Sequence, residues 1–478
     1  MPSLSDFAFE ARIAAQSLVD SVAGLARPTL RLGVTGLSRS GKTVFITALV
    51  HALTGGARLP VFRAQAQGRL RGATLQPQPD DAVPRFAQEE HLAALTGPDR
   101  HWPQSTRRIA ELRVVLDFES ARGWSSNPRS LTLDIVDYPG EWLLDLALLD
   151  RSYAQWSHET VAAFRGPRAA AAGPFLAALP GADPAGVADE GVARTVSDTF
   201  KAALAAARTE PLSFSALPPG RFLMPGDLEG SPALTFAPLD VPADHAAAPR
   251  SLAAMMERRY EAYRDHVVRP FFRDHFARLD RQIVLVDALS ALNAGPAAVA
   301  DLETALDGVL GAFRTGRNTL VSTLFSPRID RVMFAATKAD HLHHTSHDRL
   351  EAVLGVLVGR AKARAASLGA RVDVVAIASV RATREATVRD GRDELSAIVG
   401  TPLKGERIGD DLFDGETEAA VFPGELPEDP AAALAAADAG GLGLRFVRFR
   451  PPATAASAPL PQIRLDRTLE FLLGDRLA

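Results

Sequence analysis

A glycine-rich turn near the start of the chain has the residue types that hold phosphate groups. The stretch GLSRSGKT, residues 36–43, matches the pattern G-x-x-x-x-G-K-[ST] and follows an apolar run. Gly36 and Gly41 permit a tight turn whose backbone N–H groups surround a phosphate at a helix N-terminus. Lys42 is expected to reach the β- and γ-phosphates of a nucleotide, and the Thr43 hydroxyl to ligate Mg²⁺. The residues assigned to this phosphate site are Gly36, Ser38, Arg39, Ser40, Gly41, Lys42, Thr43 and Val44.

A second motif, of the form D-x-x-G, follows the apolar run 131–136. Asp137 is placed to hold Mg²⁺ through its water shell, and the Gly140 N–H to meet the γ-phosphate. An acidic turn after a strand is ordinary, but together with the phosphate turn it is a specific signal. Glu141 comes next, where related hydrolases have the Gln that orients the attacking water. Hydrolysis is therefore expected to use Glu141 in another way, to use another residue, or to be slow.

The tetrapeptide TKAD, residues 337–340, has the form of a guanine-recognition loop. Asp340 would accept hydrogen bonds from the N1 and N2 donors of guanine, which adenine lacks, while the Lys338 stem packs along the base. Thr337 stands where the commonest version has Asn, and its hydroxyl is expected to tie this loop to the phosphate turn. A looser element, Ser379-Val380-Arg381, would bring a backbone N–H to guanine O6. The alternative is an ATP enzyme with an ordinary aspartate at a strand end.

Two further positions leave alternatives open. The switch I threonine that closes on Mg²⁺ usually precedes the strand before D-x-x-G, and Thr106 occupies that place, with Ser105 and Thr74 as competitors. Arg39 lies within the phosphate turn, where small residues are usual. It either offsets γ-phosphate charge in cis, as an arginine finger does, or points to solvent or pairs with an acidic neighbour.

The elements that must position these motifs alternate between strands and helices. This alternation predicts an α/β fold with a mostly parallel sheet, covered on both faces, that binds ligands at the carboxyl ends of its strands. Strands are expected at 30–34, 112–118, 131–136, 282–287, 332–336 and 372–378, and helices at 43–53, 299–314 and 347–368.

The helical patterns between 151 and 280 predict a large, mainly helical insertion into this nucleotide domain. A strand-like LRFVRFR segment from 444 and a final amphipathic helix are expected near the other end of the chain. The expected parts are an N-terminal helix at 1–28, a first part of the nucleotide domain at 29–150 with an irregular insertion that contains short helices at 55–105, the helical subdomain at 151–280, a second part at 281–400, and a C-terminal extension at 401–478 that packs on the nucleotide domain.

Composition restricts the function classes. The chain has 478 residues, of which 47% are apolar and 23% charged, as in an ordinary soluble globular protein. Its formal net charge of -4 gives no basic excess, so nucleic acid is not an expected partner. There are no cysteines, which excludes thiolate nucleophiles and Cys-based metal sites. No secretory signal or transmembrane run is recognised, and we expect a cytoplasmic protein.

The loop after TKAD is rich in histidine. Its sequence DHLHHTSH suggests a metal site, because imidazole nitrogen is a common ligand of transition metals. The favoured interpretation is a solvated polar loop, since such residues are expected in the loop after TKAD. The histidines concerned are His341, His343, His344 and His347.

The four nucleotide motifs occur in the order P-loop, D-x-x-G, TK-x-D and S-x-R, and this order resembles the Ras-like GTPase pattern. At the level of the whole chain, GLSRSGKTVFITAL, DYPGEWLLDL, RFLMPGDLEGSPALTFAPL, and TKADHLHHTSHDRLEAVL followed by ASVRATRE resemble the YcjX-like family of bacterial P-loop proteins. The resemblance runs from about residue 2 to the C-terminus, and the TGLSRSGKT form of the P-loop is its most specific part.

The resemblance implies a Ras-like nucleotide domain with large insertions, GTP or GDP as ligand, and a stress-associated role. Members are often encoded beside a small membrane protein, which implies a membrane-attached partner and peripheral association with the inner membrane through it. The hypothesis is a cytoplasmic, Mg²⁺-dependent GTPase switch; the alternatives are a nucleotide-gated scaffold with negligible turnover, and an ATPase. The residues assigned to catalysis are Lys42, Glu141, Arg39 and Thr106, and those assigned to Mg²⁺ are Thr43, Asp137 and Thr106.

Overall fold

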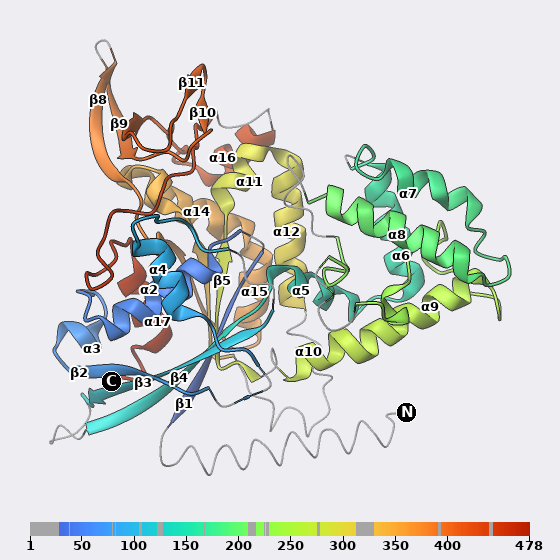
Figure 1. Cartoon of the computed structure of the whole chain (residues 1–478), viewed down its shortest axis with the longest axis horizontal. Helices are drawn as coiled ribbons and strands as arrows, with labels where there is room; N and C mark the ends of the chain where they lie inside the picture. The colour runs from blue at the N-terminus through green and yellow to red at the C-terminus, as the bar shows by residue number, and fades with distance from the viewer. Residues whose placement is uncertain are drawn as a thin grey trace. The chain divides into compact units, whose positions relative to one another are not determined.

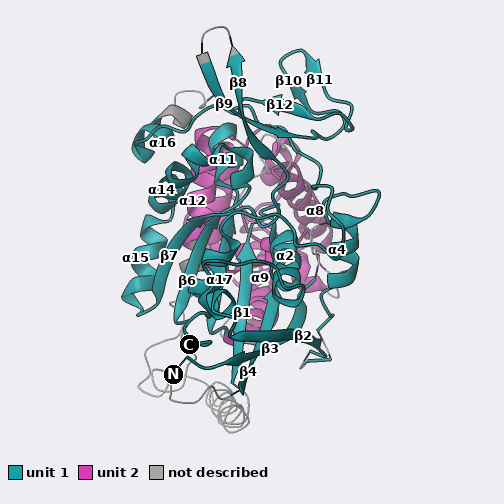
Figure 2. Ribbon diagram, turned by 90° about the vertical axis from the view of Figure 1, so that its left-hand side faces the viewer, with its two compact units in different colours: residues 1–139, 279–293, 316–478 teal, residues 140–278, 294–315 magenta. Residues whose placement is uncertain are grey.

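The structure is a computed structural model in which the chain forms two compact units (Figure 2). The first, here called the sheet unit, comprises residues 1–139, 279–293 and 316–478, and the second, the helical unit, comprises 140–278 and 294–315. The expected N-terminal helix lies outside the described residues, apart from Pro28. The described residues are 28–37, 39–78, 80–81, 83–104, 108–121, 128–166, 168–208, 217–223, 225, 229–274, 278–311, 329–390, 393–438 and 443–478.

The sheet unit is built on a seven-stranded, mostly parallel sheet, which confirms the predicted fold class (Figure 1). Its strand order is β2-β3-β4-β1-β5-β6-β7. The five strands from β4 to β7 in this order run parallel, while β3 is antiparallel to both β4 and β2. The strands are β1 (Thr29–Gly36), β2 (Leu70–Gln76), β3 (Ala110–Glu119), β4 (Pro128–Asp137), β5 (Arg281–Val286), β6 (Arg331–Ala336) and β7 (Arg371–Ala376).

The parallel strands read as continuous apolar runs because both faces of the sheet are covered. Every residue of β5 is buried, including Gln282, which donates to the Thr35 hydroxyl of β1 at 2.8 Å. Val34 of β1 is level with Asp137 of β4, and Gly36 with Leu285 of β5. This register brings the ends of the central strands to one edge of the sheet.

Strand β2 was not expected, since its stretch was predicted to be irregular with short helices. The helices are present as α3 (Arg63–Ala66) and α4 (Gln88–Thr96), but between them β2 extends the sheet beyond β3. Its side chains are exposed or half-buried throughout, and Gly72 marks a shift in register. An edge strand of this kind lacks the apolar run that made the other strands recognisable.

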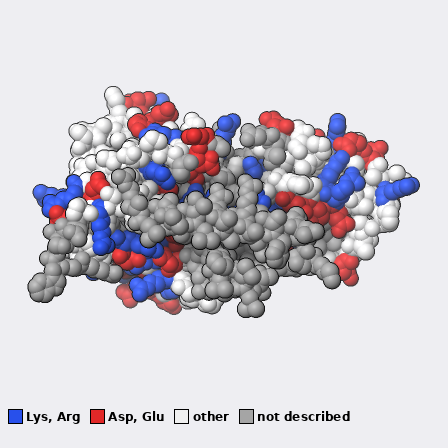
Figure 3. Space-filling view, turned by 90° about the horizontal axis from the view of Figure 1, so that it is seen from below, with Lys and Arg blue, Asp and Glu red and all other residues white. Residues whose placement is uncertain are grey.

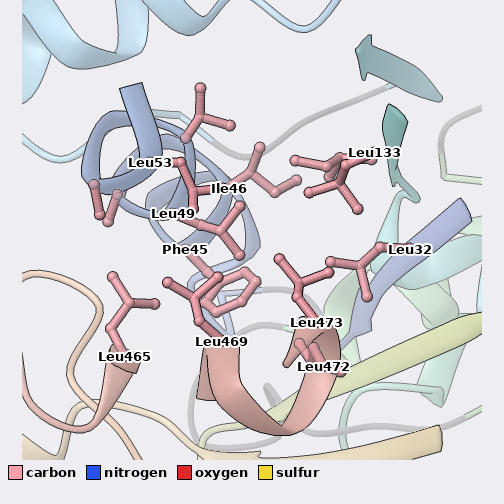
Figure 4. Packing of buried hydrophobic residues seen from close by; sticks show 14 of the residues in the cluster. Leu32, Phe45, Ile46, Leu49, Leu53, Leu133, Leu465, Leu469, Leu472 and Leu473 are labelled. Carbon is pink, nitrogen blue, oxygen red and sulfur yellow. The ribbon is translucent and has the colours of Figure 1, made fainter. Parts of the chain in front are cut away.

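One face of the sheet is covered by two helices from opposite ends of the described sequence (Figure 4). Helix α2 (Lys42–Thr54) begins in the phosphate turn, and α17 (Leu465–Leu473) lies near the end of the chain. Both helices bury apolar side chains together with Leu32 of β1 and Leu133 of β4. The packed side chains are Phe45, Ile46, Leu49 and Leu53 from α2, and Leu465, Leu469, Leu472 and Leu473 from α17.

A buried arginine fixes the beginning of β5 to the same C-terminal segment. The Arg281 side chain is fully buried and forms ion pairs with Asp475 at 2.6 Å and Asp330 at 3.0 Å. A guanidinium can be buried in this way because two carboxylates and the Leu472 carbonyl satisfy its N–H groups.

The remainder of the sheet unit contains further helices and two small sheets. The predicted helix 347–368 is divided near Val358 into α14 and α15, and the strand-like segment from 444 forms no strand beyond an isolated bridge at Phe449. The elements are α11 (Ala288–Ala294), η8 (Ala339–His341), η9 (His344–Ser346), α14 (His347–Leu357), α15 (Gly359–Ser367), α16 (Pro430–Asp438), the sheet of β8 (Arg384–Asp390), β9 (Asp393–Gly400) and β12 (Ala419–Val421), and the pair β10 (Arg407–Ile408) and β11 (Asp411–Leu412).

The helical unit has an aromatic core. Trp156 lies among the rings of Phe200, Phe236 and Tyr260, with ring centroids 5.2–5.8 Å apart. Helix α6 starts with a capping box in which Ser152 is the N-cap. The elements are α5 (Gly140–Leu144), η1 (Asp145–Leu148), α6 (Tyr153–Arg165), α7 (Gly173–Ala178), η2 (Leu179–Gly181), α8 (Glu190–Ala206), η4 (Pro232–Leu234), α9 (Leu252–Tyr263), the π-helical turn η5 (Arg264–Val268), α10 (Arg269–Asp274) and α12 (Pro296–Gly311).

The surface carries charges of both signs. On the face shown in Figure 3, the visible Lys and Arg side chains of the described residues are interspersed with Asp and Glu. Within the described part of the chain, none of the helices combines the length and apolar character needed to cross a bilayer.

Truncating the apolar contact between α17 and α2 tests the importance of this packing. Leu469 is fully buried in the α2–α17 cluster, so Leu469→Ala is expected to lower the free energy of unfolding of the sheet unit by about 3 kcal/mol. The control Leu412→Ala, at a leucine that is 60% exposed, is expected to change it by less than about 0.5 kcal/mol. Urea denaturation followed by circular dichroism measures both, and equal effects would contradict the packing argument.

Candidate functional site

The phosphate turn adopts a backbone that requires glycine at two positions. Gly36 has φ 146°, and a Cβ there would lie 2.4 Å from the Leu285 carbonyl oxygen and 2.5 Å from Ser40 Oγ. Gly41 is the N-cap of α2 in the left-handed conformation, with φ 88°. The turn between them therefore leads from β1 directly into α2, with the first N–H groups of the helix at the end of the strand.

Polar groups of this turn are arranged as an anion site requires. The Lys42 side chain, which is only 8% exposed, donates from Nζ to the carbonyl oxygens of Gly36 at 2.9 Å and Leu37 at 3.0 Å. Ser40 Oγ is buried and has no hydrogen-bond partner among the described residues. A buried hydroxyl, an ammonium group and a helix N-terminus together fit a phosphate group. Val44 lies in the first turn of α2, whereas Ser38 falls outside the described residues.

The residues expected to hold Mg²⁺ lie at the same edge of the sheet. Asp137 is fully buried at the end of β4, level with Val34 on β1, and Thr43 is buried in the first turn of α2. Carboxylate and hydroxyl oxygens suit Mg²⁺, which prefers hard oxygen ligands. This edge therefore offers two of the assigned ligand types beside the phosphate turn.

The structure separates the candidates for the switch I threonine. Thr106 and Ser105 lie outside the described residues. Thr74 is on the edge strand β2 and is paired with Val115 of β3, which in turn is paired with Thr132 of β4. Thr132 is five residues before Asp137, the last residue of β4, which corresponds to roughly 17 Å along the strand. Thr74 is therefore about this far from the edge of the sheet where Asp137 lies. Its place in the sheet argues against a role at the metal.

The loop after β6 is joined directly to the loop after β7. Asp340 is buried, and its Oδ2 accepts the Ala382 N–H at 2.8 Å. The Thr383 hydroxyl donates to the Asp340 carbonyl oxygen. The predicted base-recognition aspartate is thus held in place by backbone of the other predicted base-recognition loop.

Lys338 and Thr337 have other contacts than the sequence suggested. Lys338, with φ 61°, forms an ion pair with Asp287, the residue that follows β5. Although burial alone would raise the pKa of Asp287, Lys338 and two hydrogen bonds from Ser290 hold that pKa below its usual value. Thr337 donates both its N–H and its hydroxyl to the Val286 carbonyl. Among the described contacts Thr337 thus ties its loop to β5, not to the phosphate turn.

The element Ser379-Val380-Arg381 is braced by the C-terminal segment. The N–H groups of Ala378 and Arg381 donate to the carbonyl oxygens of Ile463 and Pro461, the second at 2.7 Å. The Arg381 side chain folds back onto the Thr383 carbonyl. The N–H groups of Ser379 and Val380 lie between these two hydrogen bonds, and Val380 is the central residue of the predicted tripeptide.

Arg39 is exposed and adopts the left-handed conformation, with φ 64°. It makes no ion pair with any of the described residues. A non-glycine residue in this region is uncommon and costs about 1 kcal/mol. Its exposure favours the alternative in which the side chain faces solvent.

Glu141 belongs to the helical unit, which begins at Gly140 with the short helix α5. The Glu141 side chain is largely buried, and a Cβ at Gly220 would lie 1.8 Å from the Glu141 carbonyl oxygen. Arg221 stacks on the Trp142 ring with its guanidinium carbon 3.7 Å from the ring centroid. The residues that follow the D-x-x-G glycine are therefore tightly packed against the segment around residue 220.

A buried carboxylate, Asp145, joins α5 and η1 to the segment around residue 220, and we call this group of contacts the anchor around Asp145. Asp145 Oδ1 accepts the Gly220 N–H at 2.5 Å, and Oδ2 accepts the Arg221 N–H at 3.3 Å and the Tyr263 hydroxyl at 2.6 Å. Burial raises the pKa of Asp145 to about 6, although these three hydrogen bonds lower it. The available signal was one aspartate within the apolar stretch WLLDLALL.

These features define a P-loop protein of the Ras-like fold class with a large helical insertion. They are the strand order, the phosphate turn after β1, the aspartate at the end of β4, and the loops after β6 and β7. The chain belongs to the YcjX-like family, DUF463, which it matches over residues 30–477. It is 39% identical over 460 residues to a protein named Ras-like GTPase YcjX from Escherichia coli K12, covering 94% of this chain and 96% of the relative. A protein of the same name from Shewanella oneidensis MR-1 is 34% identical over 476 residues, or 94% of each chain.

The raised pKa of Asp145 makes the stability of the helical unit depend on pH. Between the ordinary pKa of 3.8 and the folded value of about 6, the folded state binds more protons than the unfolded state, so stability falls as pH rises. Two pH units correspond to about 3 kcal/mol. We expect wild type to lose about this much between pH 4 and pH 7 relative to Asp145→Asn, which has no carboxylate to ionise.

Urea denaturation at a series of pH values measures this difference. It is followed by tryptophan fluorescence in chains that carry Trp102→Phe and Trp124→Phe, so that Trp142 and Trp156 are the reporters. The exposed Asp244→Asn change in the same unit is the control and should not alter the pH dependence. Parallel stability curves for wild type and Asp145→Asn would show that the carboxylate is not the cause.

Proposed function

We propose that the chain is a Mg²⁺-dependent GTPase that acts as a nucleotide switch. The observation that supports this most directly is the joining of Asp340 to Ala382, because it pairs two guanine-recognition elements at the sheet edge that carries the phosphate turn. The relatives named Ras-like GTPase support the same activity. Fold alone would not, since P-loop folds serve several nucleotides.

The phosphate end of the site has distinct roles for its residues. Lys42 and the N–H groups of the turn bind the β- and γ-phosphates, and Gly140 donates its N–H to the γ-phosphate. Thr43, Asp137 and Thr106 hold Mg²⁺. When bound, Mg²⁺ neutralises charge that develops on the phosphoryl oxygens. Thr106 remains the switch I proposal because β3, the strand it precedes, begins with Ala110 opposite Asp137.

The base end of the site selects guanine. Asp340 accepts from guanine N1 and N2, the Lys338 stem covers the base, and the Val380 N–H donates to O6. Thr337 and Arg381 position these groups through their contacts with β5 and with the C-terminal segment. An ATPase is the weaker alternative, because adenine lacks the N1 and N2 donors that Asp340 would bind; competition between GTP and ATP decides between them.

Within the helical unit, the short helix that begins at Gly140 is held by the contacts around Asp145. Gly140, which meets the γ-phosphate, begins the same short helix as Glu141 and Trp142. This helix is packed on residues 220–221, so it cannot move without moving them or breaking the hydrogen bonds of Asp145. An order change at switch II is a common way for nucleotide state to be read.

Glu141 supports a second candidate, a nucleotide-gated scaffold with negligible turnover. A largely buried carboxylate in place of the usual Gln is a poor match for the residue that orients water in fast GTPases. Single-turnover hydrolysis, with and without candidate partners, separates the scaffold from the enzyme. The stress-associated role and the membrane-attached partner stay expectations that rest on the family resemblance. The cytoplasmic location stays the expectation made from the sequence itself.

The phosphate contacts of Lys42 give the most direct test of nucleotide binding. Lys42→Ala removes the ammonium group, and we expect GTP affinity to fall about a hundredfold, which corresponds to about 3 kcal/mol. Fluorescence titration with a labelled GTP analogue measures this affinity. Lys362→Ala, at an exposed lysine of α15, is the matched control and should bind like wild type. Unchanged affinity in Lys42→Ala would refute the phosphate site.

The contacts of Asp340 give a test of base selection. Asp340→Asn replaces one carboxylate acceptor by an amide donor, which repels the guanine amino group but pairs with the C2 oxygen of xanthine. GTP affinity is expected to fall about a hundredfold while XTP affinity rises, because hydrogen bonds to a charged group contribute about 1.5–3 kcal/mol each.

Competition titrations with GTP, XTP and ATP measure this change in specificity. The exposed Asp410→Asn variant is the control and should keep the wild-type preference. If Asp340→Asn bound GTP as wild type does, the guanine assignment would be wrong even with the phosphate site intact.

A further inference from the structure

The structure sorts the four histidines after TKAD into two kinds. His341 packs edge-on against the Phe449 ring, and His347 Nε2 lies 3.2 Å from the Leu342 carbonyl oxygen, so both have structural roles. His343 and His344 instead face Glu385 of β8, and the three side chains place one ligand atom each within 4.8 Å of one another. All three belong to the sheet unit.

The spacing of these ligand atoms is close to that of a metal site. Glu385 Oε2 lies 2.8 Å from His344 Nδ1 and 3.9 Å from His343 Nε2. Ligands about 2.0–2.1 Å from a tetrahedral zinc ion are roughly 3.3–3.5 Å from one another. Small side-chain rotations would therefore bring all three atoms to bonding distance.

Neighbouring groups hold two of the ligands in suitable orientations. Thr345 Oγ1 lies 3.1 Å from His343 Nδ1 and can accept a hydrogen bond from Nδ1–H, which leaves the lone pair on Nε2, the nitrogen nearer Glu385. Arg381 donates to Glu385 Oε1 at 3.2 Å, which leaves Oε2 on the side of the histidines. The positive charge of Arg381 would repel a bound cation, but the Arg381 guanidinium donates to Oε1 and not to the Oε2 that lies near the histidines. Such outer contacts are typical around metal ligands.

We propose that His343, His344 and Glu385 form a binding site for a divalent transition metal of the Zn²⁺ type. Two imidazoles and one carboxylate suit Zn²⁺, Co²⁺ or Ni²⁺ better than Mg²⁺ or Ca²⁺, which prefer all-oxygen sites. The side chain of His344 is 62% exposed and that of Glu385 29%, so an ion can enter from solvent and keep a water ligand.

The position of this site would link it to the base-recognition loops. His343 and His344 lie shortly after Asp340 in the chain. Glu385, near the start of β8, lies shortly after Ala382, and the Ala382 N–H donates to Asp340. A metal bound to both segments would fasten the two loops together. On the proposed function, which this step assumes, the metal is expected to slow release of guanine nucleotide.

Equilibrium dialysis of the full chain against ZnCl₂, with excess Mg²⁺ and GDP present and without a polyhistidine tag, tests the site. One Zn²⁺ per chain is expected, with an affinity at least tenfold weaker in His344→Ala and in Glu385→Gln. His101→Ala, at an exposed histidine elsewhere, is the control and should bind like wild type. With Co²⁺ in place of Zn²⁺, a visible absorption band is expected in wild type and not in His344→Ala. No saturable binding, or equal binding by all variants, overturns the proposal.

Release of a fluorescent GDP analogue tests the coupling separately. With Mg²⁺ in excess throughout, release is expected to be at least threefold slower with Zn²⁺ than with a Zn²⁺-selective chelator in wild type, and equal under both conditions in His344→Ala. Equal rates in wild type overturn the coupling, whereas dialysis still decides the metal site. If the chain bound no guanine nucleotide at all, the proposed function would fail while the dialysis result would stand.

Discussion

The parallel register of the central strands is the constraint on which the candidate site depends. A one-residue slip would turn every side chain of a strand to the opposite face of the sheet. The pairings of Val34 with Asp137 and of Gly36 with Leu285 fix where three strands end. Because five strands share one direction, the phosphate turn, the aspartate expected to bind Mg²⁺ and the predicted base-recognition loops emerge at one edge.

Buried carboxylates hold the loops at this edge of the sheet in place. Asp287 follows β5 and holds Lys338, while Asp340 follows β6 and holds Ala382. Each acidic side chain thus closes a loop that starts at a neighbouring strand. In the helical unit, Asp145 has the same role for the segment around residue 220. At these three places in the described residues, a buried carboxylate holds a neighbouring loop or turn.

The sheet and its motifs were largely predictable from the sequence, because a short apolar run followed at once by Gly, Asp or Lys is typical of a buried strand that ends at a ligand site. The central strands were placed within a few residues, and the phosphate turn has the predicted backbone. Strand β2 was missed because its exposed residues carry no apolar pattern. Other contacts could not be predicted, because they join residues that are distant in sequence and a single sequence carries no pattern for such pairs. Examples are the hydrogen bonds of Thr337 to Val286, of Arg381 to Pro461 and of Gly220 to Asp145.

The packing of α17 on α2 has a consequence for how the protein is made. His51 at the end of the phosphate helix contacts the Ala458 carbonyl across a separation of 407 residues, and Val61 is held by Asp466. Contacts this distant along a chain cannot form before both segments have been synthesised. A nascent chain that has emerged past its P-loop therefore leaves the side of α2 that packs on α17 uncovered by that helix until the residues near 470 are synthesised.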